Sequence, residues 1–223
     1  MDIAGNIQQV RERIARAAAR AGRSPEDVTL VAVSKTVEPA RIREAFRLGI
    51  RDIGENRLQE AQPKIESLAA EGVRPTWHMV GHLQTNKAKA VLRLFDVIQS
   101  VDSLHLAETL SRLATRPVRI LVEVNMAGEA TKEGFRPEET EEALKKIRAL
   151  PNLEVLGLMT VAPMTADPEE VRPAFRSLSG MAERLGVRQL SMGMTDDFEV
   201  AIEEGATIVR IGRAIFGERK EEK

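Results

Sequence analysis

Hydrophobic residues follow two patterns along the chain, one typical of amphipathic helices and one typical of buried parallel strands. The first twenty residues place apolar side chains three or four positions apart on one helical face: Ile3, Ile7, Val10 and Ile14. Residues 28–36 then carry apolar and β-branched side chains at adjacent positions, which indicates a strand covered on both faces. This strand delivers Lys35, and a helical pattern follows over residues 39–48. The pattern predicts an extra N-terminal helix followed by a strand–helix unit.

The strand–helix unit recurs to the end of the chain. Further strands are expected at residues 51–54, 75–80, 95–100, 118–124, 153–160, 187–192 and 207–211. Helices are expected at residues 58–70, 88–94, 103–114, 137–150, 168–185 and 195–204, with a short one from 213. Eight such units predict an α/β fold, a single parallel (β/α)8 TIM barrel in one domain over residues 1–223. The competing open doubly wound sheet usually has a glycine-rich turn after its first strand, and the turn at Lys35 has no glycine.

The amino-acid composition argues against several classes of function. The 223 residues carry a net charge of -1, so no overall field favours nucleic acid or an anionic membrane. The chain has no cysteine, which excludes disulfides and thiolate chemistry, and its three histidines leave little for a metal site. Neither a secretory signal nor an apolar run of about 18 residues is present, so we expect a cytoplasmic protein.

The active site of such a barrel lies where its strands end. The polar or functional side chains expected at these ends are Lys35, Asn56, His78, His82, Met159, Thr160, Ser191 and Arg210. A partly desolvated lysine has a lowered pKa and can attack a carbonyl as a neutral amine. Lys35 is therefore a candidate for Schiff-base chemistry, the alternative being a solvated lysine that ends a strand.

The last two units suggest a phosphate site. Residues 191–195 and 210–213 each leave a strand, contain a glycine and open a helix, and barrels commonly bind phosphate at this place. In the alternative interpretation Thr195, Asp196 and Asp197 only cap their helix, and the two carboxylates would repel an anion.

Two further side chains have competing interpretations. His78 lies between Trp77 and Met79 and could be a hydrogen-bonded core histidine. Arg210 lies within an apolar strand, so it needs an acceptor, either a carboxylate such as Glu123 or the ring nitrogen of a ligand. A lysine for an aldehyde, glycine-lined turns for a phosphate and an arginine for a ring nitrogen together fit pyridoxal 5′-phosphate.

Several sequence blocks resemble one known family, nearly end to end and in order. They are VAVSK (31–35), IGEN (53–56), WHMVGHLQTNK (77–87), GLMT (157–160), SMGMTDD (191–197) and VRIG (209–212). On these motifs the chain is similar to the pyridoxal phosphate homeostasis proteins. The resemblance implies a fold-type III barrel like the N-terminal domain of alanine racemase, with the cofactor held as an internal aldimine.

The resemblance also assigns roles to individual residues. It implies that Lys35 forms the aldimine, Asn56 lies near the ring, and Arg210 meets the ring nitrogen. His78 and Met159 would line the pocket. The phosphate would be bound by Ser191, Thr195, Gly212 and Arg213, the last two mainly through main-chain groups. Arg213 stands where the family often has a small hydroxyl residue, and Thr195 stands where serine is frequent.

The function implied is that of a non-catalytic carrier or regulator of pyridoxal phosphate, which influences vitamin B6 and the balance of amino acids and keto acids. A racemase needs two opposed acid/base groups, whereas this chain has no tyrosine to serve as the second one. The resemblance implies a monomer, with a dimer as the alternative. Pyridoxal phosphate and amino acids are the expected ligands.

Three other functions compete with this one. The first is a pyridoxal-phosphate-dependent racemase or aldolase acting on a small amino acid, with His78 or His82 as second base. The second is a Schiff-base aldolase without cofactor, acting on sugar phosphates. The third is a nucleic-acid-binding module that uses surface arginines, although no aromatic–basic motif supports it.

Overall fold

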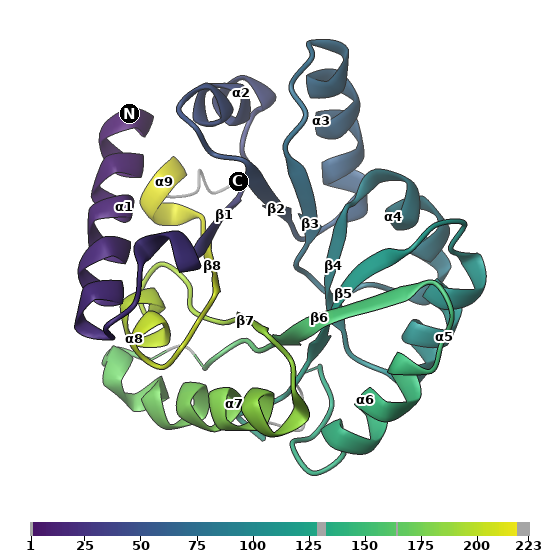
Figure 1. Cartoon of the computed structure of the whole chain (residues 1–223). Helices are drawn as coiled ribbons and strands as arrows, with labels where there is room; N and C mark the ends of the chain where they lie inside the picture. Colours follow the sequence, from purple (N-terminus) through teal and green to yellow (C-terminus); the bar gives the residue numbers. More distant parts are fainter. Residues whose placement is uncertain (1, 129–132, 164, 218–223) are drawn as a thin grey trace.

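In the part of the chain that the structure describes, eight parallel strands close into a barrel in chain order, with β1 paired to both β2 and β8 (Figure 1). This computed structural model describes residues 2–128, 133–163 and 165–217. The strands are β1 Thr29–Val33, β2 Asp52–Glu55, β3 Thr76–Met79, β4 Val97–Val101, β5 Val118–Glu123, β6 Leu153–Met159, β7 Gln189–Ser191 and β8 Ile208–Ile211. The predicted TIM barrel is thus confirmed.

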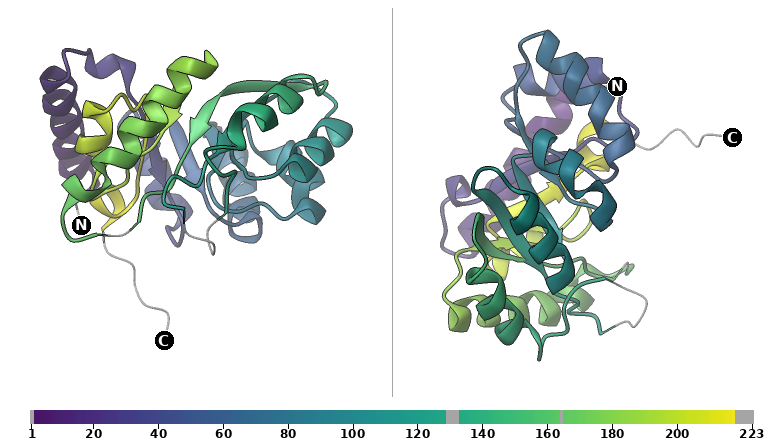
Figure 2. Two further views of the ribbon diagram at one scale, coloured as in Figure 1. Left: turned by 90° about the horizontal axis from the view of Figure 1, so that it is seen from below. Right: turned by 90° about the vertical axis from the view of Figure 1, so that its right-hand side faces the viewer.

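One helix follows each strand and covers the outside of the barrel (Figures 1 and 2). These helices are α2 Pro39–Arg47, α3 Leu58–Ala70, α4 Ala88–Leu94, α5 Leu104–Leu113, α6 Thr140–Arg148, α7 Arg172–Leu185, α8 Phe198–Glu203 and α9 Arg213–Phe216. Short 3-10 helices precede β1, α4 and α7, namely η1 Pro25–Asp27, η2 Thr85–Lys87 and η3 Pro168–Val171. Among the described residues, no helix combines the length and apolarity needed to cross a bilayer.

The extra N-terminal helix, α1 (Ile3–Arg20), packs against α8 and α9 on the outside of the ring (Figure 1). Asp2 caps it by accepting a hydrogen bond from the main-chain N–H of Gly5 (2.9 Å). The apolar face predicted from the sequence is buried, with Ile3, Ile7 and Val10 at most 2 % exposed. Helix α1 therefore shields the last two units of the barrel from water.

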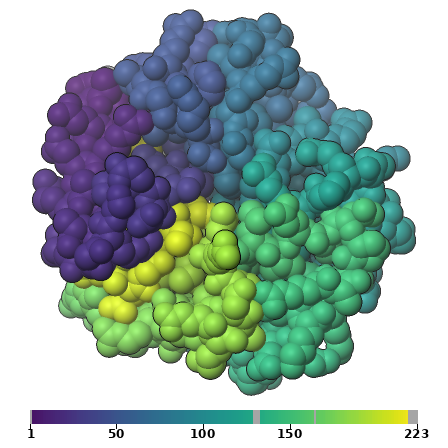
Figure 3. All heavy atoms as spheres, viewed as in Figure 1, coloured from purple at the N-terminus to yellow at the C-terminus, as the bar shows by residue number. Residues whose placement is uncertain are grey.

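Apolar side chains fill two separate regions. The larger lies between the sheet and the helices, and a smaller cluster of Val31, Leu121, Met159 and Ile208 lies inside the barrel. Figure 3 views the end of the barrel where η1 leads into β1, and the atoms of strands and helices fill the middle of the ring. The barrel is a packed core, so chemistry has to take place at its other end, where the strands finish.

Two predicted boundaries near the candidate site were wrong. The first strand ends at Val33 rather than continuing to residue 36, because Lys35 and Thr36 form a turn. The helix after β7 begins at Phe198 rather than Thr195. There the Asp197 carboxylate accepts from the main-chain N–H of Met194 and stabilises a turn ahead of the helix. Both differences lengthen the turns that follow the strands.

Candidate functional site

Lys35 lies in a tight turn just beyond β1. The main-chain N–H of Ser34 still donates to Gly54 of β2 (2.9 Å), and that of Val37 then donates back to the carbonyl of Ser34 (3.0 Å). Between them Thr36 has a left-handed φ of 62°, a conformation that residues other than glycine adopt only at some cost. Lys35 itself is half-buried and makes a polar contact, so it is not the fully solvated lysine of the alternative interpretation.

The turn after β8 lies directly against the end of β1. Ala32 pairs with Ile211 in the sheet, and a Cβ atom placed on Gly212 would lie 3.0 Å from the carbonyl oxygen of Val33. This close approach favours glycine at position 212. The barrel thereby brings Lys35 next to the glycine-containing turn from which a phosphate contact was predicted.

The turn after β7 is the second predicted phosphate element. Gly193 has a φ of 91°, and a Cβ there would come within 2.6 Å of Ala201 and 2.8 Å of the Phe198 main chain, so the turn requires glycine. Helices α8 and α9 have only six and four residues, so their dipoles add little to anion binding. Any phosphate site here depends on the turns themselves.

The two turns are joined by an ion pair between Arg213 and Asp196, with a nitrogen–oxygen distance of 2.6 Å. Both side chains are about half exposed, so the pair contributes little to stability. Its local effect is to neutralise the carboxylate that would otherwise repel a phosphate. Asp197, the other carboxylate in this turn, is buried, and desolvation raises its pKa. The ion pair with Arg213 thus reduces the repulsion predicted from Asp196.

A chain of hydrogen bonds crosses the inside of the barrel from β8 to β2. The Arg210 guanidinium donates to Ser191 Oγ (2.6 Å), which donates to Gln99 Oε1 (2.6 Å). The Gln99 amide contacts His78 Nδ1 (2.9 Å), and His78 Nε2 contacts Asp52 Oδ1 (2.9 Å). If Gln99 donates to Nδ1, a neutral imidazole carries its proton on Nε2 and donates it to the carboxylate. Every donor then points the same way, from cation to carboxylate.

These hydrogen bonds decide between some of the interpretations that the sequence left open. His78 is 4 % exposed with both ring nitrogens bonded, which fits the core interpretation and leaves no free nitrogen for a second base. The phosphate contact of Ser191 stays a prediction. It would have to come from the main chain, because the Ser191 hydroxyl is buried and bonded on both sides. Met159 is fully buried inside the barrel, and its contact with a ligand also stays a prediction.

Arg210 does not hydrogen-bond to the carboxylate expected for it. Its second described acceptor is the main-chain carbonyl of Thr160 (2.7 Å). Glu123, on β5, acts on Arg210 through its charge, without a hydrogen bond between the two side chains. Burial lowers the pKa of Arg210 to about 10, so the side chain remains a cation at neutral pH.

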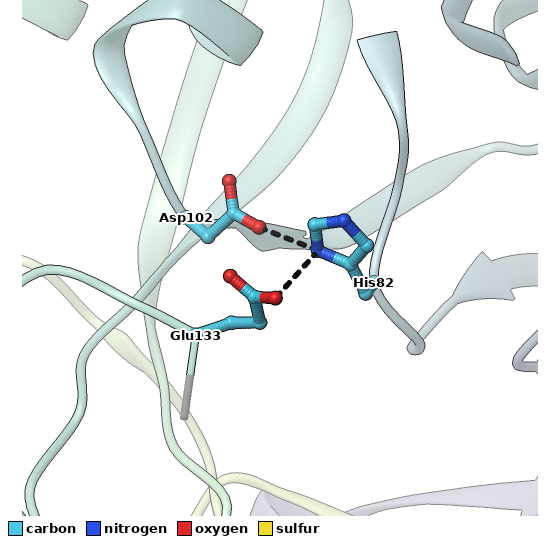
Figure 4. Close-up of side chains that lie close together, drawn as sticks. All are labelled: His82, Asp102 and Glu133. Atoms are coloured by element: carbon cyan, nitrogen blue, oxygen red, sulfur yellow. Dashed lines mark hydrogen bonds and ion pairs between the residues drawn. The ribbon is translucent and has the colours of Figure 1, made fainter. Parts of the chain in front are cut away.

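Glu123 belongs to a second group of polar residues, which lies at the mouth of the barrel. It lines a cavity of about 320 Å³ together with Asn56 and His82. His82 Nδ1 lies 2.9 Å from Asp102 Oδ2 and 3.7 Å from Glu133 Oε1 (Figure 4). Ligand atoms of these three side chains lie within 4.8 Å of one another, although His82 and Glu133 are exposed. The expectation that the chain binds no metal stays a prediction.

Glu123 is expected to make stability depend on pH. Burial, followed by the charge of Asp102, raises its pKa from 4.5 to about 7. Because the folded chain then binds this proton more tightly than the unfolded chain, the free energy of unfolding should fall as pH rises from about 4.5 to 7. Glu123→Gln cannot ionise and should be more stable than the wild type by about 2–3 kcal/mol at pH 8, but not at pH 4.5. Urea unfolding at both pH values checks this; parallel pH profiles for the two proteins would contradict it.

Several of these residues were not identified as candidates from sequence. Gln99 was detectable as a polar residue within the apolar strand β4. Asp52 gave no such signal, because it occurs in a strand of only four residues.

Comparison with known proteins identifies relatives of this chain. Residues 5–220 match the family model "Alanine racemase, N-terminal domain". The chain is 44 % identical to the pyridoxal phosphate homeostasis protein of Aquifex aeolicus, over 99 % of this chain and 100 % of that protein. It is 39 % identical to the protein of that name from Escherichia coli strain K12, over 98 % and 97 % of the two chains.

Several solved structures also resemble this chain. PipY of Synechococcus elongatus PCC7942, solved with PLP bound, is 34 % identical with a TM-score of 0.84, over 97 % of this chain and all of PipY. An unknown protein from Bifidobacterium adolescentis is 38 % identical with a TM-score of 0.87, over 96 % and 94 % of the two chains. An alanine racemase of Clostridium difficile is 14 % identical with a TM-score of 0.72, over 95 % of this chain and 60 % of the racemase, which shows a shared fold.

Proposed function

This chain belongs to the pyridoxal phosphate homeostasis protein family, and we propose that it binds pyridoxal 5′-phosphate covalently through Lys35 and carries or buffers it without committed catalysis. The observation that carries the proposal is the half-buried Lys35 turn, packed beside the Gly212 turn at the closure of the barrel. An amine beside a turn suited to phosphate would serve the two ends of the cofactor, its aldehyde and its phosphate.

The residues around Lys35 fit the cofactor in a specific way. The side-chain oxygen of Asn56 is buried and accepts no hydrogen bond from a described residue. A buried acceptor without a donor costs free energy, and the phenolic hydroxyl of pyridoxal phosphate is a suitable donor. Gly81 packs its main chain onto Asn56, since a Cβ there would lie 2.5 Å from the Asn56 carbonyl oxygen. Asn56 is therefore held in place beside the cavity.

Other residues would bind the remaining parts of the cofactor. Arg210 uses two of its five N–H donors within the barrel and would donate another to the ring nitrogen. His78 and Met159 would form the floor beneath the ring. Main-chain groups of Ser191, Gly212 and Arg213, with the Thr195 hydroxyl, would bind the phosphate. All nine predicted site residues thus lie on or beside the strand ends of β1, β2, β3, β6, β7 and β8.

Pyridoxal phosphate supplies an aldehyde for reversible bonding to amines and a ring that withdraws electrons. Arg210 limits the second property. As a cation at neutral pH, its guanidinium would donate an N–H hydrogen bond to the ring nitrogen and keep its own proton, and a ring that stays unprotonated is the poorer electron sink. The site is thus better suited to holding the cofactor than to removing a proton from a bound amino acid.

The racemase or aldolase alternative depends on His82. His78 is bonded at both ring nitrogens, whereas His82 is about half exposed and pairs with Asp102, an arrangement that orients an imidazole as a base. His82 is consequently the one histidine of the two that could supply the second acid/base group of an enzyme.

Loading and turnover can be measured on the same sample. We expect purified protein to take up one equivalent of pyridoxal phosphate, seen as a visible absorption band, and to show no steady exchange of the α-hydrogen of any amino acid in deuterated water. His82→Ala should leave both results unchanged. Steady exchange that disappears in His82→Ala would replace the carrier by the enzyme, and failure of the wild type to load would contradict the proposal itself.

A further inference from the structure

A buried lysine on α3 contacts the turn that carries Lys35. Lys64 is 7 % exposed, and its ammonium group donates to three acceptors. These are the main-chain carbonyl of Ser34 (2.7 Å), Glu55 Oε1 (2.9 Å) and Glu60 Oε1 (2.6 Å). An ammonium group has three donors, so Lys64 is fully hydrogen-bonded. We refer to Lys64, Glu55 and Glu60 as the Lys64 cluster.

The Lys64 cluster holds the chain on both sides of Lys35. On the N-terminal side, Ser34 is bonded twice, through its carbonyl to Lys64 and through its hydroxyl to Glu55 Oε1 (2.6 Å). On the C-terminal side, the main-chain N–H of Thr36 donates to the Glu60 carboxylate. This second bond stabilises the left-handed conformation of Thr36. The main chain that sets the direction of Lys35 is thereby tied to β2 and α3.

Stability alone is a weak reason for burying these charges. Glu55 is fully buried, its second carboxylate oxygen has no hydrogen bond from a described residue, and burial raises its pKa. Lys64 lies on the helix face that otherwise buries Leu58, Ala61 and Leu68. Well-packed apolar residues at such positions are often as stable as a buried ion pair or more so. The cluster lies under the turn that carries Lys35, and this position indicates that its charges hold the turn in place.

We propose that Lys64 is a positioning residue: through Ser34 and Glu60 it fixes the turn so that Lys35 meets the aldehyde of pyridoxal phosphate at bonding distance. This inference rests on the proposed function. In that reaction Lys35 Nζ forms a double bond to the aldehyde carbon, and the carbonyl oxygen leaves as water with both hydrogens of the neutral amine. Such a step is sensitive to placement, because an error of about 1 Å can cost about 100-fold in rate.

The test compares a ligand that can react with Lys35 and one that cannot. Pyridoxal 5′-phosphate reacts through its aldehyde, whereas pyridoxamine 5′-phosphate has the same ring and phosphate but no aldehyde. In Lys64→Met we expect the rate constant of covalent bond formation, followed by absorbance in a stopped-flow instrument, to fall about 10-fold or more. The dissociation constant of pyridoxamine 5′-phosphate should change less than about twofold.

Two further variants make the result decisive. Glu60→Ala removes a partly exposed side chain and should slow the reaction in the same selective way, even if Lys64→Met does not fold. Lys145→Met, on the surface of α6, is the matched control and should behave as the wild type. A parallel loss for both ligands would show that the cluster is only structural, and an unchanged rate would overturn the proposal. A wild type that does not react at all would instead contradict the proposed function.

Discussion

Replacing Lys35 with alanine is expected to abolish covalent loading and to weaken the binding of pyridoxal phosphate at least about 100-fold, or about 2.7 kcal/mol. The physical reason is that the covalent bond is lost, while the contacts proposed for Asn56, Arg210 and the turns after β7 and β8 would remain. The measurement is absorbance before and after borohydride, followed by mass mapping of the modified lysine. In the wild type the reduced adduct should map to Lys35 alone.

The control for this experiment is Lys89→Ala, which removes an exposed lysine of α4. This variant should load and reduce like the wild type. A borohydride-stable adduct that persists in Lys35→Ala on another lysine would show that the turn after β1 does not provide the reacting amine. The fold would stand in that case, but the assignment of the site would not.

Replacing Arg210 with methionine is expected to lower the free energy of unfolding by about 3–5 kcal/mol in the absence of cofactor. Arg210 is 5 % exposed and donates to Ser191 and to the carbonyl of Thr160, so its removal leaves both acceptors buried and deprives Glu123 of a nearby cation. Urea unfolding at pH 7 measures the effect. A loss below about 1 kcal/mol would mean that the chain of hydrogen bonds across the barrel contributes little.

A matched surface variant and a double variant separate the causes. Arg176→Met on α7, whose side chain is 69 % exposed, should change stability by no more than about 1 kcal/mol. Glu123→Gln should stabilise the Arg210→Met variant by more than it stabilises the wild type, because the carboxylate left without its cation is then replaced by a neutral amide. Strict additivity of the two substitutions would show that Glu123 and Arg210 do not interact.

The candidate site residues were chosen from single strands. The apolar run before Lys35 made that residue a candidate, and the apolar strand around Arg210 predicted a buried cation that needs an acceptor. What Arg210 bonds to was not predictable in the same way. Glu123 was a reasonable choice by charge, but the described acceptors are a serine hydroxyl and a main-chain carbonyl from two other strands. Which groups meet inside a barrel depends on strand order and register, which a local pattern does not contain.

Hydrophobic periodicity was enough to predict the barrel, because it is a local property that each strand and helix carries separately. It predicted a helix at residues 58–70, which are the bounds of α3, and it predicted Lys35 near the end of the first strand. The place of Lys64, on this same helix and under the Lys35 turn, could be seen only in the folded structure. A lysine in an amphipathic helix normally reaches solvent, and whether it is instead buried depends on the acceptors that other segments bring to it.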